Sequence, residues 1–309
     1  MDLAQTISLL AAAVTAGTAI LYAALGEIVT EKSGILNLGV EGMMLSGAVM
    51  GFFGTHISGS VWIGLIFALL AGGSLALIHS FLTITMKANQ VVSGLSLTMF
   101  GTGLSAYLGK DLIGIPARAT FGTVHFPILS EIPLIGPIFF QQNTLVYISY
   151  IIAVLLWILL FYTRLGLSIR AVGENPAAAD SMGLNVFSIR YLSTLFGGMM
   201  AGLGGASLSL SYAPAWLENM TAGRGWIAVA MVIFAAWNPL RALFGSYFFG
   251  GIDALGFRLQ IIGFNIPSYF LRMLPYLLTI VVLILINVRK EGRISSPHAL
   301  GTPYDREDR

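Results

Sequence analysis

Long apolar runs alternate with short polar segments along most of the chain. A helix needs about 20 mostly apolar residues to cross the hydrocarbon core of a membrane. Windows bounded by charge, glycine or proline predict nine spans: 3–25, 34–54, 61–85, 91–109, 144–163, 190–212, 225–240, 242–257 and 274–288. The pattern therefore predicts an all-α polytopic membrane protein with about 8–10 transmembrane helices.

Three stretches depart from this pattern. The segment 110–143 contains several prolines, which break any span, and it predicts an ordered external cap with short helices. Asn238 and Pro239 interrupt the region after Trp226, which predicts either two spans or one re-entrant segment. The polar tail 291–309 predicts a flexible segment, so that residues 1–290 form a single transmembrane domain.

Composition agrees with a lipid environment. Hydrophobic residues make up 56% of the chain and charged residues 10%, whereas a soluble domain averages about 25% charged residues. Asp2 is the only charge before Glu27, so the first run predicts a retained span and not a cleaved signal. The chain has no cysteine, which excludes disulfides and thiolate metal sites, and its net charge of +2 gives no nucleic-acid footprint.

Lysine and arginine in the connecting loops predict the orientation. The better-populated side carries the following basic residues: Lys32, Lys87, Arg164, Arg170, Arg190, Arg241, Arg289, Lys290 and Arg293. The other side carries Lys110, Arg118, Arg224, Arg258 and Arg272. We therefore expect the first side and the C-terminal tail to be cytoplasmic and the N-terminus to be outside, in a bacterial inner membrane.

A polar segment rich in small residues, 169–186, lies between two apolar runs. Asn175 suits a helix N-cap, and Pro176 suits the first helical position. The alanines that follow favour a helix of about two turns, which Gly183 can end. The alternative interpretation is a plain connecting loop.

Polar groups inside the spans are the candidates for a pathway. Asn37 and Glu41 are four residues apart, so on a helix they share one face. Because a carboxylate is costly at membrane depth, Glu41 either lines a pathway or gate or forms a hydrogen-bonded clamp between helices. Asp253 and Asn238 pose the same question.

Glycine pairs with G-x-x-x-G spacing occur at Gly47 and Gly51 and at Gly198 and Gly202. Such pairs allow helix backbones to approach closely. They predict tight packing within the bundle, with sliding surfaces as the alternative.

Catalytic sequence motifs are missing. It contains no phosphate-binding loop and no H-E-x-x-H or G-x-S-x-G motif. The four histidines are scattered, so we predict no catalytic residue, no metal site and no cofactor bound by this chain.

Six strings resemble one family in the family's order. Residues 169–186 resemble the coupling loop of ABC importer permeases in the branch that serves branched-chain amino acids, simple sugars and nucleosides. The further strings that carry the resemblance are 26–42, 88–94, 221–228, 233–239 and 251–255. Glu174-Asn-Pro176 together with Ala179-Asp-Ser-Met-Gly183 is most similar to the shorter permease of the nucleoside subgroup.

The resemblance implies a helical bundle of the type II ABC importer kind and a non-catalytic permease subunit of an ATP-driven importer. It implies three partners: a second, longer permease, a cytoplasmic ATPase that holds ATP and Mg²⁺, and a substrate-binding lipoprotein that meets the cap 110–143. It also implies that a coupling helix seats in the ATPase, through Gly173, Glu174, Asn175, Pro176, Ala178, Ala179, Asp180 and Gly183.

The substrate implied is a nucleoside, with a simple sugar or another small polar solute as the alternative. Stacking and polar groups are available as pathway or gating candidates at Asn37, Glu41, Phe100, Tyr212, Trp226 and Asn238. The chain departs from the family between Phe234 and Trp237, where Ala235 and Ala236 replace a glycine and a basic residue. A role for that basic residue is therefore not carried over.

Two rival functions compete with the permease. An ion-coupled secondary transporter predicts more buried carboxylates and an inverted repeat with broken helices. A membrane enzyme or scaffold predicts clustered polar side chains on one face. The sequence shows neither pattern clearly, and the segment 169–186 favours the permease.

Overall fold

The computed structural model describes residues 3–261 and 296–306, together with residues 270, 273, 274, 276, 277, 280, 281 and 284. Over these residues the chain is mostly helical. The helices are α1 Leu3–Lys32, α2 Val40–Ser58, α3 Val61–Ser80, α4 Gln90–Gly109, α5 Thr144–Tyr162, α6 Arg164–Glu174, α7 Pro176–Ser181, α8 Val186–Ser207, α9 Arg224–Phe234 and α10 Pro239–Ile261. Short π-helical segments extend α3 over Phe81–Thr85 and α8 over Leu208–Tyr212.

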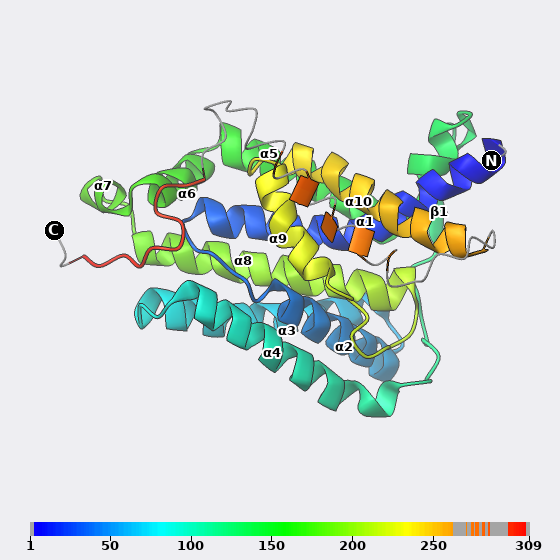
Figure 1. The fold of residues 1–309 in the computed structure, drawn as a ribbon, viewed down its shortest axis with the longest axis horizontal. Coiled ribbons are helices and arrows are strands. Elements are labelled where there is room, and N and C mark those ends of the chain that lie inside the picture. The colour runs from blue at the N-terminus through cyan, green and yellow to red at the C-terminus, as the bar shows by residue number, and fades with distance from the viewer. Residues whose placement is uncertain are drawn as a thin grey trace.

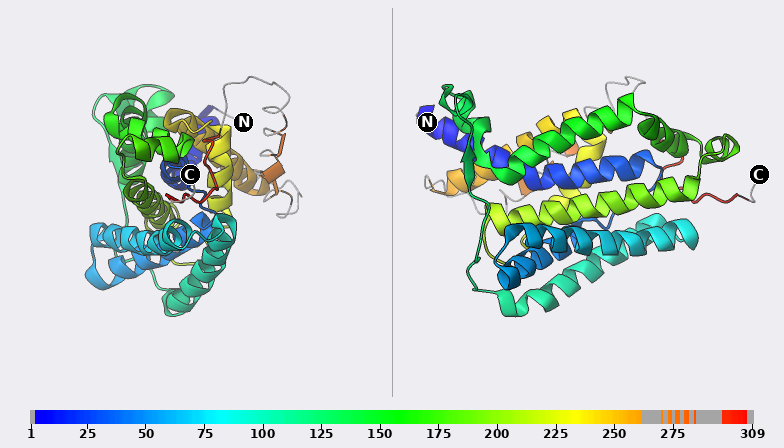
Figure 2. Two further views of the ribbon diagram at one scale, coloured as in Figure 1. Left: turned by 90° about the vertical axis from the view of Figure 1, so that its left-hand side faces the viewer. Right: turned by 180° about the vertical axis from the view of Figure 1, so that it is seen from behind.

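The long helices run along the long axis of the molecule (Figure 1). α1 and α8 lie in the middle, with α2, α3 and α4 on one side and α5, α9 and α10 on the other (Figures 1 and 2). Helix α7 and the C-terminal residues occupy one end, which we call the α7 end. The N-terminus and strand β1 lie at the other, the hairpin end.

Within the described residues, five helices are long and apolar enough to cross a membrane: α1, α3, α4, α5 and α8, with α3, α4 and α8 counted together with the short helical turns that follow them. α2 and α10 have comparable lengths of 19 and 23 residues. The prediction of an all-α polytopic membrane protein is therefore confirmed. The predicted span 274–288 lies largely outside the described residues.

The segment 110–143 contains short helices at Lys110–Leu112, Leu129–Glu131 and Gly136–Phe140. It also forms an antiparallel hairpin that the sequence did not predict, in which β1 (Thr123–His125) pairs with β2 (Gln141–Asn143). Asn143 ends the hairpin and begins α5, because its Oδ1 accepts a hydrogen bond from Val146 N at 3.1 Å.

Glycines bring α2, α3 and α8 together at backbone distance. A Cβ on Gly47 or Gly205 would collide with the backbone of the facing helix, at Gly202 and Met44 respectively. Gly72 meets Gly198 of α8 in the same way. The prediction that the G-x-x-x-G pairs serve tight packing is confirmed, and we call this contact the glycine seam.

Turns interrupt two of the predicted spans. The span 34–54 becomes helical only at Val40, because Gly34 has a φ of +91° and Asn37 Oδ1 accepts a hydrogen bond from Gly39 N at 2.9 Å. Asn37 and Glu41 therefore do not share a helix face.

The span 225–240 is an 11-residue helix that ends at Phe234. Ala236 and Trp237 then adopt left-handed backbone, with φ of +52° and +54°, and Pro239 begins α10. Proline cannot continue a helix through its own nitrogen, and it disfavours helical backbone in the preceding residue, so the chain turns here.

Candidate functional site

The polar segment 169–186 contains the end of α6 and all of α7, and the residue between the two helices caps α7. Asn175 lies between α6 and α7, and its Oδ1 accepts a hydrogen bond from Ala178 N at 3.0 Å. Pro176 is the first residue of α7, and Gly183 follows the helix with a φ of +83°. The predicted two-turn helix with its Asn cap and glycine end is confirmed.

The outer face of α7 consists of small or flexible side chains. Ala177, Ala178 and Ser181 are exposed, and Met182 is 84% exposed. Ala179 turns inward and packs with Val172 and Val186. Because the outer face of α7 carries no bulky or branched side chain, α7 can fit closely into a groove of another protein.

The C-terminal residues 296–306 lie against this helix pair, and we call them the strap. Ala299 N donates a hydrogen bond to Gly173 O at 2.9 Å, and Gly301 N donates to Gly34 O at 3.3 Å. Arg190 of α8 donates from Nη1 to Thr302 O at 3.4 Å. The structure therefore differs from the predicted flexible tail over 296–306, because backbone groups of the strap find partners on α6 and on the α1–α2 turn.

Charged contacts fasten the strap at two further points. Arg306 donates two hydrogen bonds to Asp180, both at 2.8 Å, and Tyr304 donates a third at 3.1 Å. These hydrogen bonds and the charge of Asp180 raise the pKa of Arg306 above its ordinary value. Asp305 pairs with Lys87, which follows α3.

This arrangement changes the roles that were expected for the two acidic coupling candidates. The Asp180 side chain is 7% exposed and its hydrogen bonds go to Tyr304 and Arg306 of the strap. Glu174 accepts a 3.4 Å hydrogen bond from His298 N and remains exposed.

A second polar cluster surrounds the first turn of α9, inside the bundle. Glu41 of α2 is 5% exposed and accepts hydrogen bonds from Gly223 N at 2.8 Å, Gly225 N at 2.6 Å and Thr221 Oγ1 at 2.5 Å. A helix N-terminus attracts a carboxylate because its first N–H groups have no partner within the helix. Glu41 is therefore a clamp between α2 and α9, the second of the two interpretations of this residue.

Arg224 extends from the same turn of α9 towards α10. It forms an ion pair with Asp253, in the middle of α10, and its guanidinium lies 5.6 Å from the ring centroid of Tyr212. The Arg224 side chain is 10% exposed and that of Asp253 is 31% exposed. The structure thus brings two pathway candidates, Glu41 and Tyr212, next to a charged pair that the sequence did not single out as a pair.

The remaining pathway candidates lie elsewhere. Asn37 is fully buried, and its backbone N–H donates to Glu27 Oε1 at 3.0 Å. Phe100 is 54% exposed on α4. Asn238 caps α10, where its Oδ1 accepts a hydrogen bond from Leu240 N at 3.0 Å. Trp226 is half-buried in the first turn of α9.

Sequence reasoning missed a buried polar contact near the α7 end. Trp237 donates from Nε1 to Glu31 Oε2 at 2.6 Å, and Lys32 lies 5.6 Å above the Trp237 ring. Glu27 and Glu31, four residues apart on α1, were the available signal, because two carboxylates in an apolar run require partners. This contact fixes the α9–α10 turn against the end of α1.

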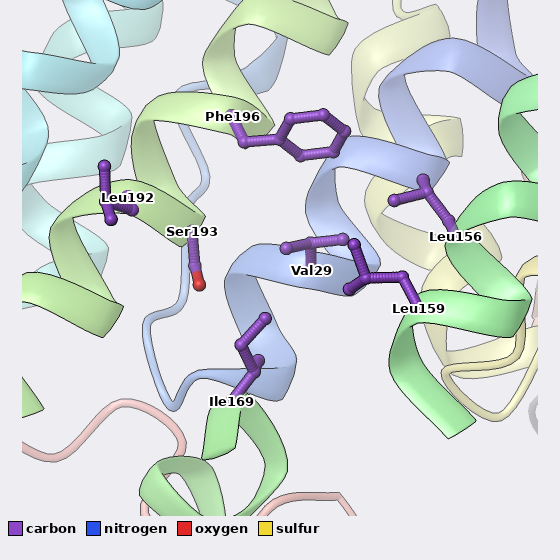
Figure 3. Close-up of a pocket in the computed structure, with 7 residues that line it drawn as sticks. All are labelled: Val29, Leu156, Leu159, Ile169, Leu192, Ser193 and Phe196. Carbon is purple, nitrogen blue, oxygen red and sulfur yellow. The ribbon is translucent and has the colours of Figure 1, made fainter. Parts of the chain in front are cut away.

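An apolar cavity of about 140 Å³ separates α5 and α6 from α1 and α8 (Figure 3). Its lining residues are Val29, Leu156, Leu159, Ile169, Leu192, Ser193 and Phe196. Helices α5 and α6, which precede α7, are therefore packed less closely against α1 and α8 than the helices of the glycine seam are packed against one another.

Among the described residues no group of three or more His, Cys, Asp or Glu side chains is placed to hold a metal ion. The two clusters instead offer a docking surface at the α7 end and a polar site within the bundle. Neither contains the groups of a hydrolytic centre.

Comparisons with known proteins cover nearly the whole chain. Residues 9–285 match the family described as the permease component of branched-chain amino acid transport systems. A Haloferax volcanii permease provisionally assigned to an ABC transporter of glucose is 42% identical, over 97% of this chain and 98% of its own. No solved structure matches the chain.

Two further relatives carry nucleoside names. A guanosine ABC transporter permease of Bacillus subtilis is 35% identical over 98% of both chains. A nucleoside ABC transporter permease of Lactococcus lactis is 35% identical over 93% of both chains. B. subtilis also has a second guanosine permease, which is 24% identical over 72% of this chain, so the relatives occur as pairs of different permeases.

The chain belongs to the permease family of branched-chain amino acid transport systems, as a non-catalytic, multi-pass membrane subunit of an ABC transporter.

Proposed function

We propose that this permease imports nucleosides, driven by ATP that a cytoplasmic ATPase subunit hydrolyses with Mg²⁺. The permease forms the pathway together with a second, longer permease of the same family, in keeping with the paired permeases among its relatives. A substrate-binding lipoprotein delivers the nucleoside to the hairpin end, where the segment 110–143 lies.

Helix α7 is the observation that carries this proposal. It exposes alanines and Met182 at one end of a membrane bundle, next to the strap, and it suits the groove of an ATPase. Lys32, Lys87 and Arg170 lie near the same end, which supports a cytoplasmic location for α7 and the strap. Gly173, Glu174, Asn175, Pro176, Ala178 and Gly183 then form the contact region, with Asp180 holding the strap behind it.

The substrate assignment draws on the two relatives with nucleoside names, each similar over more than nine-tenths of its length. A glucose-type sugar is the second candidate, because the Haloferax relative has the higher identity.

The test is to purify the chain with the products of neighbouring genes and to reconstitute the complex in proteoliposomes. We expect ATPase activity that guanosine and the binding protein stimulate together, with uptake of labelled guanosine. Stimulation by glucose and not by nucleosides would replace the substrate and keep the transporter. A chain that associates with no ATPase would contradict the proposal as a whole.

A further inference from the structure

Helix α9 brings an arginine into the interior of the bundle. With 11 residues it is about 16 Å long, roughly half the thickness of the hydrocarbon core. Its first residue, Arg224, contacts Tyr212 of the segment that extends α8 and Asp253 in the middle of α10. Charged side chains inside a membrane protein usually mark a substrate or ion pathway, because they are costly to place there.

Glu41 is fully engaged and is therefore no part of an open site. Both of its carboxylate oxygens accept hydrogen bonds from the loop and first turn of α9. A Cβ on Gly225 would also collide with the Glu41 backbone, so a ligand has no room between them. Glu41 fixes the position from which Arg224 extends.

Arg224 and Asp253 retain unused hydrogen-bonding capacity. Arg224 uses Nη1 for the carbonyl oxygens of Met220 and Thr221 and Nη2 for Asp253, which leaves only its buried Nε without an acceptor among the described residues. Asp253 contacts Arg224 through its Oδ2 atom, and the Asp253 side chain is 31% exposed. The face of Tyr212 flanks the guanidinium. The partly exposed carboxylate of Asp253 thus lies beside a buried donor and an aromatic ring.

The charge of this group selects the class of solute. Asp253 neutralises Arg224, and the N–H groups around the start of α9 compensate Glu41, so this group of described residues leaves no cation to balance a carboxylate or a phosphate. A neutral solute with neighbouring hydroxyl groups fits better, because one hydroxyl donates to the carboxylate and the other accepts from the guanidinium.

We propose that Arg224, Asp253 and Tyr212 form a recognition site for the neighbouring hydroxyl groups of a neutral sugar ring, such as the ribose of a nucleoside. Asp253 accepts from the hydroxyl groups, Arg224 donates to their oxygens, and Tyr212 packs against the ring. This inference rests on the proposed function, since it names the part of the substrate that the permease itself reads.

The first experiment compares uptake of guanosine with that of 2′,3′-dideoxyguanosine in the reconstituted transporter with one binding protein throughout. In the Asp253→Asn variant we expect the preference for guanosine over the dideoxy analogue to fall about tenfold, since a hydrogen bond to a charged group is lost. Glu218→Gln, an exposed carboxylate in the loop before α9 and outside the segment 110–143, is the matched control and should keep the preference.

An unchanged preference in a folded Asp253→Asn complex would overturn the inference. So would an equal loss of uptake for both solutes, which is the result expected of an ion pair that only supports the fold. If the unmodified transporter imports neither nucleosides nor sugars, the proposed function fails instead, and the two failures are distinguishable.

A second experiment does not depend on the stability of that variant. The chain has no cysteine, so Ala222→Cys, at an exposed position two residues before Arg224, introduces a unique thiol. We expect guanosine to slow its reaction with a maleimide several-fold and leucine to have no effect. Equal reaction rates in the presence and absence of guanosine would contradict a site at this position.

Discussion

Helices α7 and α9 are both short, but their first turns are satisfied in opposite ways. The N-terminus of α7 is capped by Asn175, the residue that directly precedes it. The N-terminus of α9 is held by Glu41, a carboxylate from α2. A helix that caps itself depends little on its surroundings and can serve as a surface for a partner. A helix that another helix caps is tied to the bundle and fixes the interior.

The largest effect that this comparison predicts belongs to Glu41. Glu41→Leu leaves two N–H groups of α9 and the Thr221 hydroxyl without their acceptor inside the protein. We expect a loss of about 3 kcal/mol or more in the free energy of unfolding, with loss of uptake, as measured by thermal unfolding of the solubilised complex. Glu41→Gln keeps one acceptor oxygen, so we expect its stability to lie between that of the unmodified protein and that of Glu41→Leu. Lost uptake with an unchanged melting temperature would favour a pathway role for Glu41.

The second-largest effect is expected from a change beside α7, which should weaken the coupling between ATP hydrolysis and uptake and leave the fold intact. Gly183→Trp places a large side chain beside the exposed face of α7, and we expect ATP-driven uptake to fall roughly tenfold or more, which corresponds to about 1.4 kcal/mol of docking energy. Gly59→Trp is the matched control, because Gly59 also has a positive φ and open space around it but lies after α2. Equal uptake in the two variants would remove α7 as the coupling helix.

The strap offers a smaller test of the same end. Breaking the contact with Asp180→Asn and Arg306→Gln should lower substrate-stimulated ATPase activity about two- to fivefold, since pairs near the surface contribute modestly. The reversed pair, Asp180→Arg with Arg306→Asp, should recover part of the loss. Activity that is insensitive to all these variants would show that the strap does not support α7.

The smallest effect should come from a local cap. Asn238→Ala removes the acceptor at the start of α10, which should cost about 1 kcal/mol of stability and leave uptake unchanged in the folded fraction. Thermal unfolding and uptake measured on the same preparation distinguish a cap from a pathway residue. A specific loss of uptake at normal stability would return Asn238 to the pathway candidates.

Features that depend on nearby residues were predictable from the sequence. The apolar runs predicted the long helices, and Asn175 with Pro176 predicted the start of α7, because a cap acts over three residues. The turn at Asn37 was missed although it is also local. Its side chain accepts a hydrogen bond from its own backbone two residues on, and this competes with the helix that the apolar pattern favours.

Features that join distant segments were not predictable. The partners of Glu41 lie some 180 residues further along the chain, and the strap binds α6, α8 and the turn after α3 through polar contacts that leave no periodic pattern. The left-handed backbone at Ala236 and Trp237 accompanies a hydrogen bond from Trp237 to Glu31, some 200 residues earlier in the chain. Nothing about Ala235 and Ala236 in the sequence indicated this turn.

The glycine seam has a mechanical consequence for transport. Where backbones touch, there is no layer of side chains that can change rotamer and absorb a displacement, so we expect α2, α3 and α8 to move as one rigid body. The cavity beside α5 and α6 is the compliant boundary of that body. If α7 docks on an ATPase as proposed, we expect a push on α7 to move α6 and α5 as a lever against this rigid centre.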